Sequence, residues 1–178
     1  MFFARLPKKI IFWLICREFY LKIIPPKMNT SNRIKLFIID ANKTFAQLMV
    51  LETGKIFKEE NHTVHVFENG ELCEQFLHIK PDLVFVDYHL NSNNSNAMNG
   101  LQVIKMIKNT NPEMDFIIIT NDEKSELFLK VLQTGAYDYL IKDSNVTYRL
   151  GQAMTKWLKR AKLKQDIKPN NLLNYENR

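Results

Sequence analysis

The sequence Pro81-Asp-Leu-Val-Phe-Val-Asp87 places four consecutive apolar residues between a Pro-Asp turn and an acidic residue. A short apolar run with these boundaries is typical of a strand that is buried on both faces, as strands of parallel sheets are. Four other runs rich in β-forming residues lie at 36–39, 63–67, 116–119 and 138–141. We therefore predict five strands.

Longer segments with helical periodicity separate these runs, at about 43–60, 101–107, 123–134 and 146–163. Asn69-Gly70 is expected to turn the chain after the second strand, and Gly135 to end the third of these helices. Alternation of strands and helices predicts an α/β fold with a doubly wound five-stranded parallel sheet. We expect the strand order 2-1-3-4-5, in which the ligand site lies at the carboxyl ends of the strands.

The composition is that of an ordinary globular protein, with 46% apolar and 25% charged residues among 178. Most of the net charge of +6 comes from residues 1–28, which carry six Lys or Arg against a single Glu. A second basic cluster lies at 156–168. A solvated helix end explains that cluster more simply than a DNA-binding surface does.

We expect residues 1–32 to be a leader, 33–163 the folded domain, and 164–178 a flexible tail. The apolar run Ile10-Ile-Phe-Trp-Leu-Ile-Cys16 has seven residues, too few to span a membrane. The leader is either genuine, with a basic amphipathic segment that rests on a membrane surface as one alternative, or an extended start before Met28. Cys16 and Cys73 have no CxxC spacing and are interpreted as inert.

Four polar residues follow the predicted strands: Asp40, Asp87, Thr120 and Lys142. Asp40 and Asp87 should face each other, and two close carboxylates need a cation, for which Mg²⁺ is suited. Lys142 and Thr120 add a positive charge and a hydroxyl donor. An aspartate in such a site can accept a phosphoryl group. Taken singly, each residue also fits an ordinary turn, cap or solvated surface position.

The chain from about residue 34 to 163 resembles a response-regulator receiver domain, with the flavodoxin-like fold. The resemblance is carried by Leu36-Phe-Ile-Ile-Asp40, Pro81-Asp-Leu-Val-Phe-Val-Asp87, Met98-Asn-Gly100, Ile117-Ile-Ile-Thr120 and Gly135-Ala-Tyr-Asp-Tyr-Leu-Ile-Lys142. It implies two-component signalling by a phosphoprotein that forms an aspartyl phosphate.

By this resemblance Asp87 is the phosphoacceptor, and Thr120 and Lys142 contact the phosphoryl group. Asp40, Asp87 and the backbone carbonyl of His89 would hold Mg²⁺. A further implied residue is Tyr139, an aromatic switch that couples Thr120 to the face formed by the fourth helix, fifth strand and fifth helix.

The sequence departs from the family pattern at position 41, where Ala41 replaces the usual second acid. The Mg²⁺ site should be weaker, with Asn42 or water as partial substitutes. The polar loop 91–97 is longer than usual and is either a mobile flap or a tolerated insertion. His89 and Asp122 lie where receivers tune phosphate loss, although the His89 side chain also fits a solvated loop residue.

The leading hypothesis is a stand-alone cytoplasmic receiver, not an enzyme beyond its own phosphorylation and dephosphorylation. It would take phosphate from a histidine kinase or phosphotransfer protein and bind a downstream protein, with a homodimer as a further alternative. The residues after the last predicted helix are too few for a DNA-binding domain. Two alternatives are a degenerate, non-phosphorylated binding module, which Ala41 favours, and a flavodoxin-like or dinucleotide-binding oxidoreductase, which lacks a phosphate loop or GxGxxG.

Overall fold

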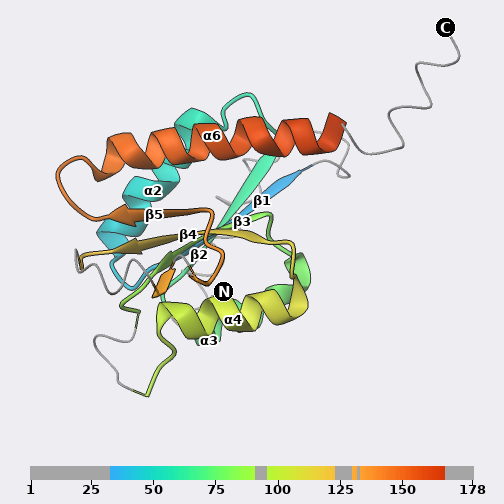
Figure 1. The fold of residues 1–178 in the computed structure, drawn as a ribbon. Helices are drawn as coiled ribbons and strands as arrows, with labels where there is room; N and C mark the ends of the chain where they lie inside the picture. Colours follow the sequence, from blue (N-terminus) through green and yellow to red (C-terminus); the bar gives the residue numbers. More distant parts are fainter. Residues whose placement is uncertain (1–32, 91–95, 123–129, 132, 167–178) are drawn as a thin grey trace, which may run out of the picture. The chain divides into compact units, whose positions relative to one another are not determined.

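The computed structural model describes residues 33–90, 96–122, 130–131 and 133–166, all of which belong to one compact unit that starts at Arg33. Its centre is a five-stranded parallel sheet in the order β2-β1-β3-β4-β5 (Figure 1). The strands are β1 (Ile34–Ile39), β2 (His62–Phe67), β3 (Leu83–Asp87), β4 (Asp115–Thr120) and β5 (Asp138–Ile141). This confirms the predicted fold class and strand order.

Helices cover both faces of the sheet (Figure 1). On one face lie α2 (Lys43–Ile56) and α6 (Val146–Asp166), whose inner sides form one apolar core with the sheet. On the other lie α3 (Gly70–Glu74) and α4 (Gly100–Thr110), with the short 3₁₀ helix η2 (Leu77–Ile79) after α3. Because β3 and β1 lie between two apolar layers, their residues are nearly all buried, which explains their continuous apolar sequence.

Some boundaries differ from the sequence-based expectation. Helix α2 ends at Ile56 and not near Glu60, and α6 continues to Asp166. Asn69-Gly70 is not a simple turn, because Asn69 caps α3 by accepting the Leu72 N–H at 2.8 Å. Gly135 has φ +72°, the left-handed backbone expected at a helix end.

Several predictions concern residues outside the described ranges: the leader 1–32, including Cys16, the loop segment 91–95, most of the predicted helix 123–134, and the tail from 167. Within the ranges that are described, no helix is long and apolar enough to cross a membrane.

Candidate functional site

Two aspartates lie side by side at the carboxyl edge of the sheet. Ile39 of β1 pairs in register with Val86 of β3, so Asp40 and Asp87 are the next residues on neighbouring strands. Only 2% of Asp40 and 8% of Asp87 is exposed. The topological switch point of the sheet thus carries a nearly buried carboxylate pair.

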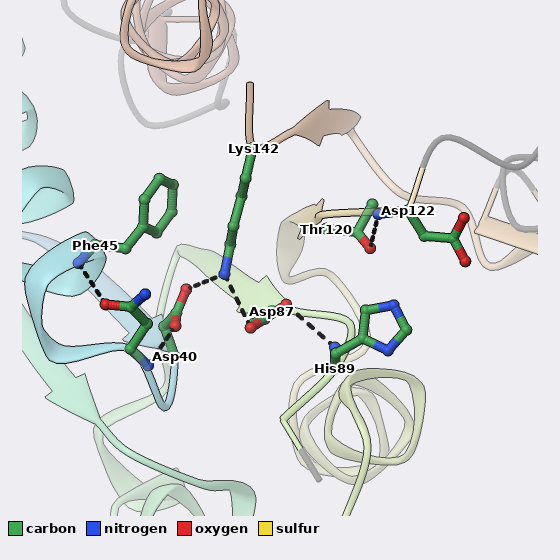
Figure 2. A network of polar contacts seen from close by, with 8 residues as sticks. Asp40, Phe45, Asp87, His89, Thr120, Asp122 and Lys142 are labelled. Atoms are coloured by element: carbon green, nitrogen blue, oxygen red, sulfur yellow. Dashed lines mark hydrogen bonds and ion pairs between the residues drawn. The ribbon is translucent and has the colours of Figure 1, made fainter. Parts of the chain in front are cut away.

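The ammonium of Lys142 bridges these two carboxylates. Its Nζ donates to Asp40 Oδ2 at 2.8 Å and to Asp87 Oδ2 at 2.9 Å, and 9% of its side chain is exposed (Figure 2). Lys142 directly follows β5, and its N–H bonds the Thr120 carbonyl at 2.7 Å. The side chain therefore reaches past β4 to the central strands. Charge-assisted hydrogen bonds of this length are among the stronger polar contacts in proteins.

The other oxygen of each carboxylate accepts a backbone N–H two residues further on. Asp40 Oδ1 accepts the Asn42 N–H at 2.8 Å. Asp87 Oδ1 accepts the His89 N–H at 3.1 Å (Figure 2). These local turns fix the orientation of both side chains before any ligand binds. The four carboxylate oxygens are each held by one donor.

The electrostatic balance of the pair follows from its burial. Removal from water raises the pKa of Asp40 above its ordinary value, and the bond and charge of Lys142 act in the opposite direction. The nearby Asp87 raises that pKa further, while the Asn42 N–H lowers it. The site thus contains a carboxylate whose negative charge costs free energy, so a cation is stabilised beside it.

Asn42 and Phe45 support the bridging lysine, a role that the sequence did not predict for this pair. The Asn42 side chain caps α2 by accepting the Phe45 N–H at 3.1 Å. The Lys142 ammonium lies over the face of the Phe45 ring, with Nζ 4.7 Å from the ring centroid (Figure 2). An Asn just before a periodic apolar run is a helix-start signal that could have predicted the cap. No sequence pattern predicts the contact of Phe45 with Lys142, because 97 positions separate them.

A second polar chain runs from the end of β4 to β5. The Thr120 hydroxyl, with no exposed surface, accepts the Asp122 N–H at 3.1 Å. The Tyr139 hydroxyl donates to the Asp122 carbonyl at 2.7 Å. The threonine and the aromatic residue that the sequence singled out are therefore joined through the backbone of Asp122.

The start of α4 lies directly against the backbone that follows Asp87. A Cβ at Gly100 would lie 2.4 Å from the Asp87 carbonyl oxygen and 2.8 Å from Tyr88 Cα, so only glycine fits. The Gly100 N–H bonds the Tyr88 carbonyl at 3.1 Å. Asn99 and Gln102 form a reciprocal capping box at this helix start.

The predicted site residues fall into two groups. Asp40, Asp87 and Lys142 bond one another directly, and His89 joins them through its N–H, while its ring packs edge-on against Tyr88. Thr120, Asp122 and Tyr139 form a second group, which is linked by its own hydrogen bonds at the ends of β4 and β5. The arrangement presents one carboxylate, Asp87, with an ammonium already in place.

The oxygen atoms at this edge of the sheet match part of what a divalent cation requires. Asp40, Asp87 and the His89 carbonyl are hard oxygens, which fit Mg²⁺. Ala41 contributes no oxygen, and the Asn42 side-chain oxygen already caps α2. In the part of the chain that the structure describes, no group of three His, Cys, Asp or Glu side chains could hold a metal. The residues fit Mg²⁺, with one carboxylate fewer than a strong site would have.

A family model described as the response regulator receiver domain matches residues 36–155. The chain belongs to this family. Among solved structures, the receiver is similar to a signal receiver domain from Vibrio parahaemolyticus, with 27% identity and a TM-score of 0.62 over 76% of this chain and 98% of that one. It is also similar to the BeF3-activated receiver domain of DrrB, with 25% identity and a TM-score of 0.54 over 71% and 98%; DrrB is a response regulator of Thermotoga maritima.

Curated relatives of the receiver are transcriptional regulators. YdfI of Bacillus subtilis is 28% identical over 115 residues, 62% of this chain and 49% of YdfI. NtrC of Escherichia coli K12 is 32% identical over 85 residues, 47% of this chain and 17% of NtrC. The chain thus spans about half the length of YdfI and less of NtrC. Receiver domains are modules of two-component signalling, not true enzymes. They interact with histidine kinases or phosphotransfer proteins, and generally bind Mg²⁺ where they are phosphorylated.

Proposed function

We propose that this receiver accepts a phosphoryl group on Asp87 and that phosphorylation controls its binding to a downstream protein. The observation that carries the proposal is the Lys142 ammonium, which bonds the carboxylates of both Asp87 and Asp40. Asp87 is the more exposed of the two aspartates, at 8% against 2%. An incoming donor therefore has access to Asp87 first.

The chemistry is an in-line transfer. A carboxylate oxygen of Asp87 forms a bond to phosphorus while the P–N bond of a phosphohistidine breaks, and the electron pair leaves with the imidazole nitrogen. Lys142 stands beside the oxygens on which negative charge accumulates, and the Thr120 hydroxyl, an acceptor toward Asp122, retains its own proton for donation. Bound Mg²⁺, held by Asp40, Asp87 and the His89 carbonyl, would neutralise further charge.

The signal would pass along the bonded chain from Thr120 through Asp122 to Tyr139. A phosphoryl group that bonds the Thr120 hydroxyl would alter the hydrogen bond between that hydroxyl and the Asp122 N–H. The Tyr139 hydroxyl, which donates to the Asp122 carbonyl at 2.7 Å, would respond to the resulting shift of the backbone. Tyr139 lies on β5, the strand at the centre of the face that the sequence predicts from the fourth helix, fifth strand and fifth helix. We place the phosphorylation-dependent protein partner on this face, and treat a homodimer through it as one form of such a partner.

We further propose that the receiver acts in the cytoplasm and takes phosphate from a histidine kinase or a phosphotransfer protein. The support is the family, whose model matches residues 36–155. His89 lies two residues after Asp87, and Asp122 lies two residues after Thr120. From these positions both would tune the rate at which water removes the phosphate.

The experiment is to incubate the full chain with phosphoramidate and Mg²⁺ and to measure intact mass. We expect one phosphoryl adduct in the wild type and none in Asp87→Asn. Asp82→Asn is the matched control, because Asp82 lies at the opposite end of the same strand, where it bonds the Lys35 N–H at 2.8 Å. Loss of the adduct in the Asp82 variant, or its persistence in the Asp87 variant, would exclude Asp87 as the acceptor.

A second candidate is a receiver that is never phosphorylated and acts as a constitutive binding module. Ala41 favours it, and so does the engagement of the Asn42 oxygen in the α2 cap. Ala41→Asp separates the two functions. A wild-type chain that stays unmodified while Ala41→Asp gains the adduct supports the binding module, whereas an adduct in both supports the phosphorylated receiver.

A further inference from the structure

The Lys142 ammonium bridges Asp40 and Asp87 from the end of a long, flexible side chain (Figure 2). Its place therefore depends on the backbone that carries it. Lys142 lies directly after β5, and its N–H bonds the Thr120 carbonyl at 2.7 Å, which ties the residue to β4. That bond holds the backbone on the sheet side only, so the chain after Lys142 needs a second support.

The chain turns tightly at Lys142. The Asp143 N–H donates to the Ile141 carbonyl at 2.9 Å, which reverses the chain around the lysine. Asp143 then leads into α6, because its Oδ1 accepts the Asn145 N–H at 2.8 Å and its carbonyl accepts the Val146 N–H at 3.1 Å. Lys142 thus lies between the end of a strand and the start of a helix, and the geometry of this turn sets the direction of its side chain.

Arg149 of α6 bonds the residues on both sides of Lys142. Its guanidinium nitrogen Nη2 donates to the Ile141 carbonyl at 2.8 Å and lies 2.6 Å from Asp143 Oδ1. The side chains of Arg149 and Asp143 are each 35% exposed, so water shields the pair only in part. The guanidinium therefore closes the turn from the helix side, as the Thr120 carbonyl does from the sheet side.

The ion pair of Arg149 and Asp143 is present at neutral pH. The bond from Arg149 contributes most to lowering the pKa of Asp143, and the Asn145 N–H lowers it further. The pair is lost only as the pH falls through that lowered value. Because partly exposed ion pairs add little to stability, we expect the pair to act on the geometry of the turn more than on the free energy of unfolding.

A second arginine of α6 offers a comparison. Arg160 also pairs with an aspartate, Asp115, and its side chain is 40% exposed against 35% for Arg149. Asp115 is the first residue of β4, at the opposite end of that strand from the candidate site. Both arginines thus tie α6 to an aspartate, but only Arg149 encloses a residue of the site.

We propose that Arg149 is a positioning residue, which holds the turn around Lys142 so that the ammonium stays between Asp40 and Asp87. Its effect on phosphorylation rests on the proposed function, in which Lys142 neutralises the charge that accumulates on the phosphoryl oxygens. Such chemistry is sensitive to position, since a misplacement of about 1 Å can slow a reaction by about 100-fold.

The first test follows the Lys142 ammonium by NMR of the full chain with ¹⁵N-labelled lysine. A buried, hydrogen-bonded ammonium exchanges its protons slowly with water and gives a signal that solvated lysines lack. The disappearance of that signal in Lys142→Arg assigns it. We expect Arg149→Met to accelerate the exchange several-fold and weaken the signal, whereas the matched control Arg160→Met leaves it unchanged.

The second test measures the rate of adduct formation with phosphoramidate and saturating Mg²⁺ by intact mass. We expect Arg149→Met to slow the reaction about tenfold and Arg160→Met to keep the wild-type rate, with equal urea midpoints for the two variants. Asp143→Asn retains an Oδ1 for the Asn145 N–H and loses the charge, so it should slow the reaction less. The double variant should be no slower than Arg149→Met, because both changes remove the same ion pair.

Wild-type exchange of the ammonium in Arg149→Met overturns the inference, and so does a wild type in which the Lys142 ammonium gives no protected signal. An equal slowing in Arg160→Met also overturns it, because it would reflect a general loosening of α6. A weakened signal with an unchanged rate removes the positioning role and leaves phosphorylation of Asp87 standing. If the wild type gains no adduct, the proposed phosphorylation fails, while the ammonium signal still decides whether Arg149 holds Lys142.

Discussion

Replacing Gly100 by alanine tests how closely α4 is packed against the phosphoacceptor strand. The added methyl group would lie 2.4 Å from the Asp87 carbonyl oxygen and 2.8 Å from Tyr88 Cα, and both are backbone atoms. Backbone atoms cannot move aside as a flexible side chain can, so α4 must shift away from β3. Overpacking of this kind costs about 1–3 kcal/mol. We expect that loss, reduced slightly by the better helix propensity of alanine.

Gly54 provides the matched control for this substitution. It lies in the last turn of α2, and nothing is within 4 Å of the position that a Cβ would take. Alanine there removes only the entropic cost of glycine in a helix, and should stabilise the fold by about 0.5–1 kcal/mol. The same change of residue is thus expected to have opposite signs at the two positions.

Urea denaturation followed by far-ultraviolet circular dichroism measures both variants. With a denaturant slope of about 2 kcal/mol per molar, the midpoints of Gly100→Ala and Gly54→Ala should differ by roughly 1 M. Phosphorylation of Asp87 should also slow in Gly100→Ala, since the displaced backbone carries the acceptor. A Gly100→Ala chain as stable as the wild type, or a destabilised Gly54→Ala chain, would refute the reasoning.

Lys142→Met should destabilise the chain by about 3 kcal/mol in urea denaturation at pH 7, because two buried carboxylates lose their shared cation; unchanged stability would contradict the bridge. Phe45→Leu should slow phosphorylation by phosphoramidate several-fold, since the contact with Lys142 is worth about 1 kcal/mol, whereas Phe45→Tyr should keep the rate. Burial raises the pKa of the Cys73 thiol to about 12, so in a Cys16→Ser chain a thiol reagent at pH 8 should label Cys73 only on unfolding. Rapid labelling of the native chain would show that the thiol is accessible.

Strand ends were predictable from the sequence because the signals that mark them are local. Asp40, Asp87, Thr120 and Lys142 each follow a short apolar run, and the doubly wound fold brings the carboxyl ends of all strands to one edge. The grouping of Asp40, Asp87 and Lys142 follows from that rule alone. The rule does not predict which carboxylate oxygens the ammonium bonds. That choice depends on how far the Lys142 side chain reaches past β4.

Contacts between distant segments account for what the sequence could not reveal. The 2.4 Å approach at Gly100 depends on where α4 begins relative to β3, and a glycine at a helix start has the same local appearance whether or not a backbone lies behind it. Gly151 is similar, since the Ile56 side chain comes within 3.9 Å of the position that a Cβ would take there only because α2 packs beside α6. Sequence patterns report the face of each helix, whereas close approaches arise from pairs of helices and strands.

The absence of an acid at position 41 changes the charge of the site as well as its ligand count. Asp40, Asp87 and Lys142 together carry a formal charge of −1, and a carboxylate at position 41 would make it −2, so the attraction for a divalent cation would increase. Ala41→Asn restores an oxygen without the charge, and Ala41→Asp restores both. If charge dominates, Mg²⁺ affinity measured by calorimetry on the unphosphorylated chain should rise strongly in Ala41→Asp and little in Ala41→Asn. Equal gains in the two variants would mean instead that the missing ligand atom is what limits the site.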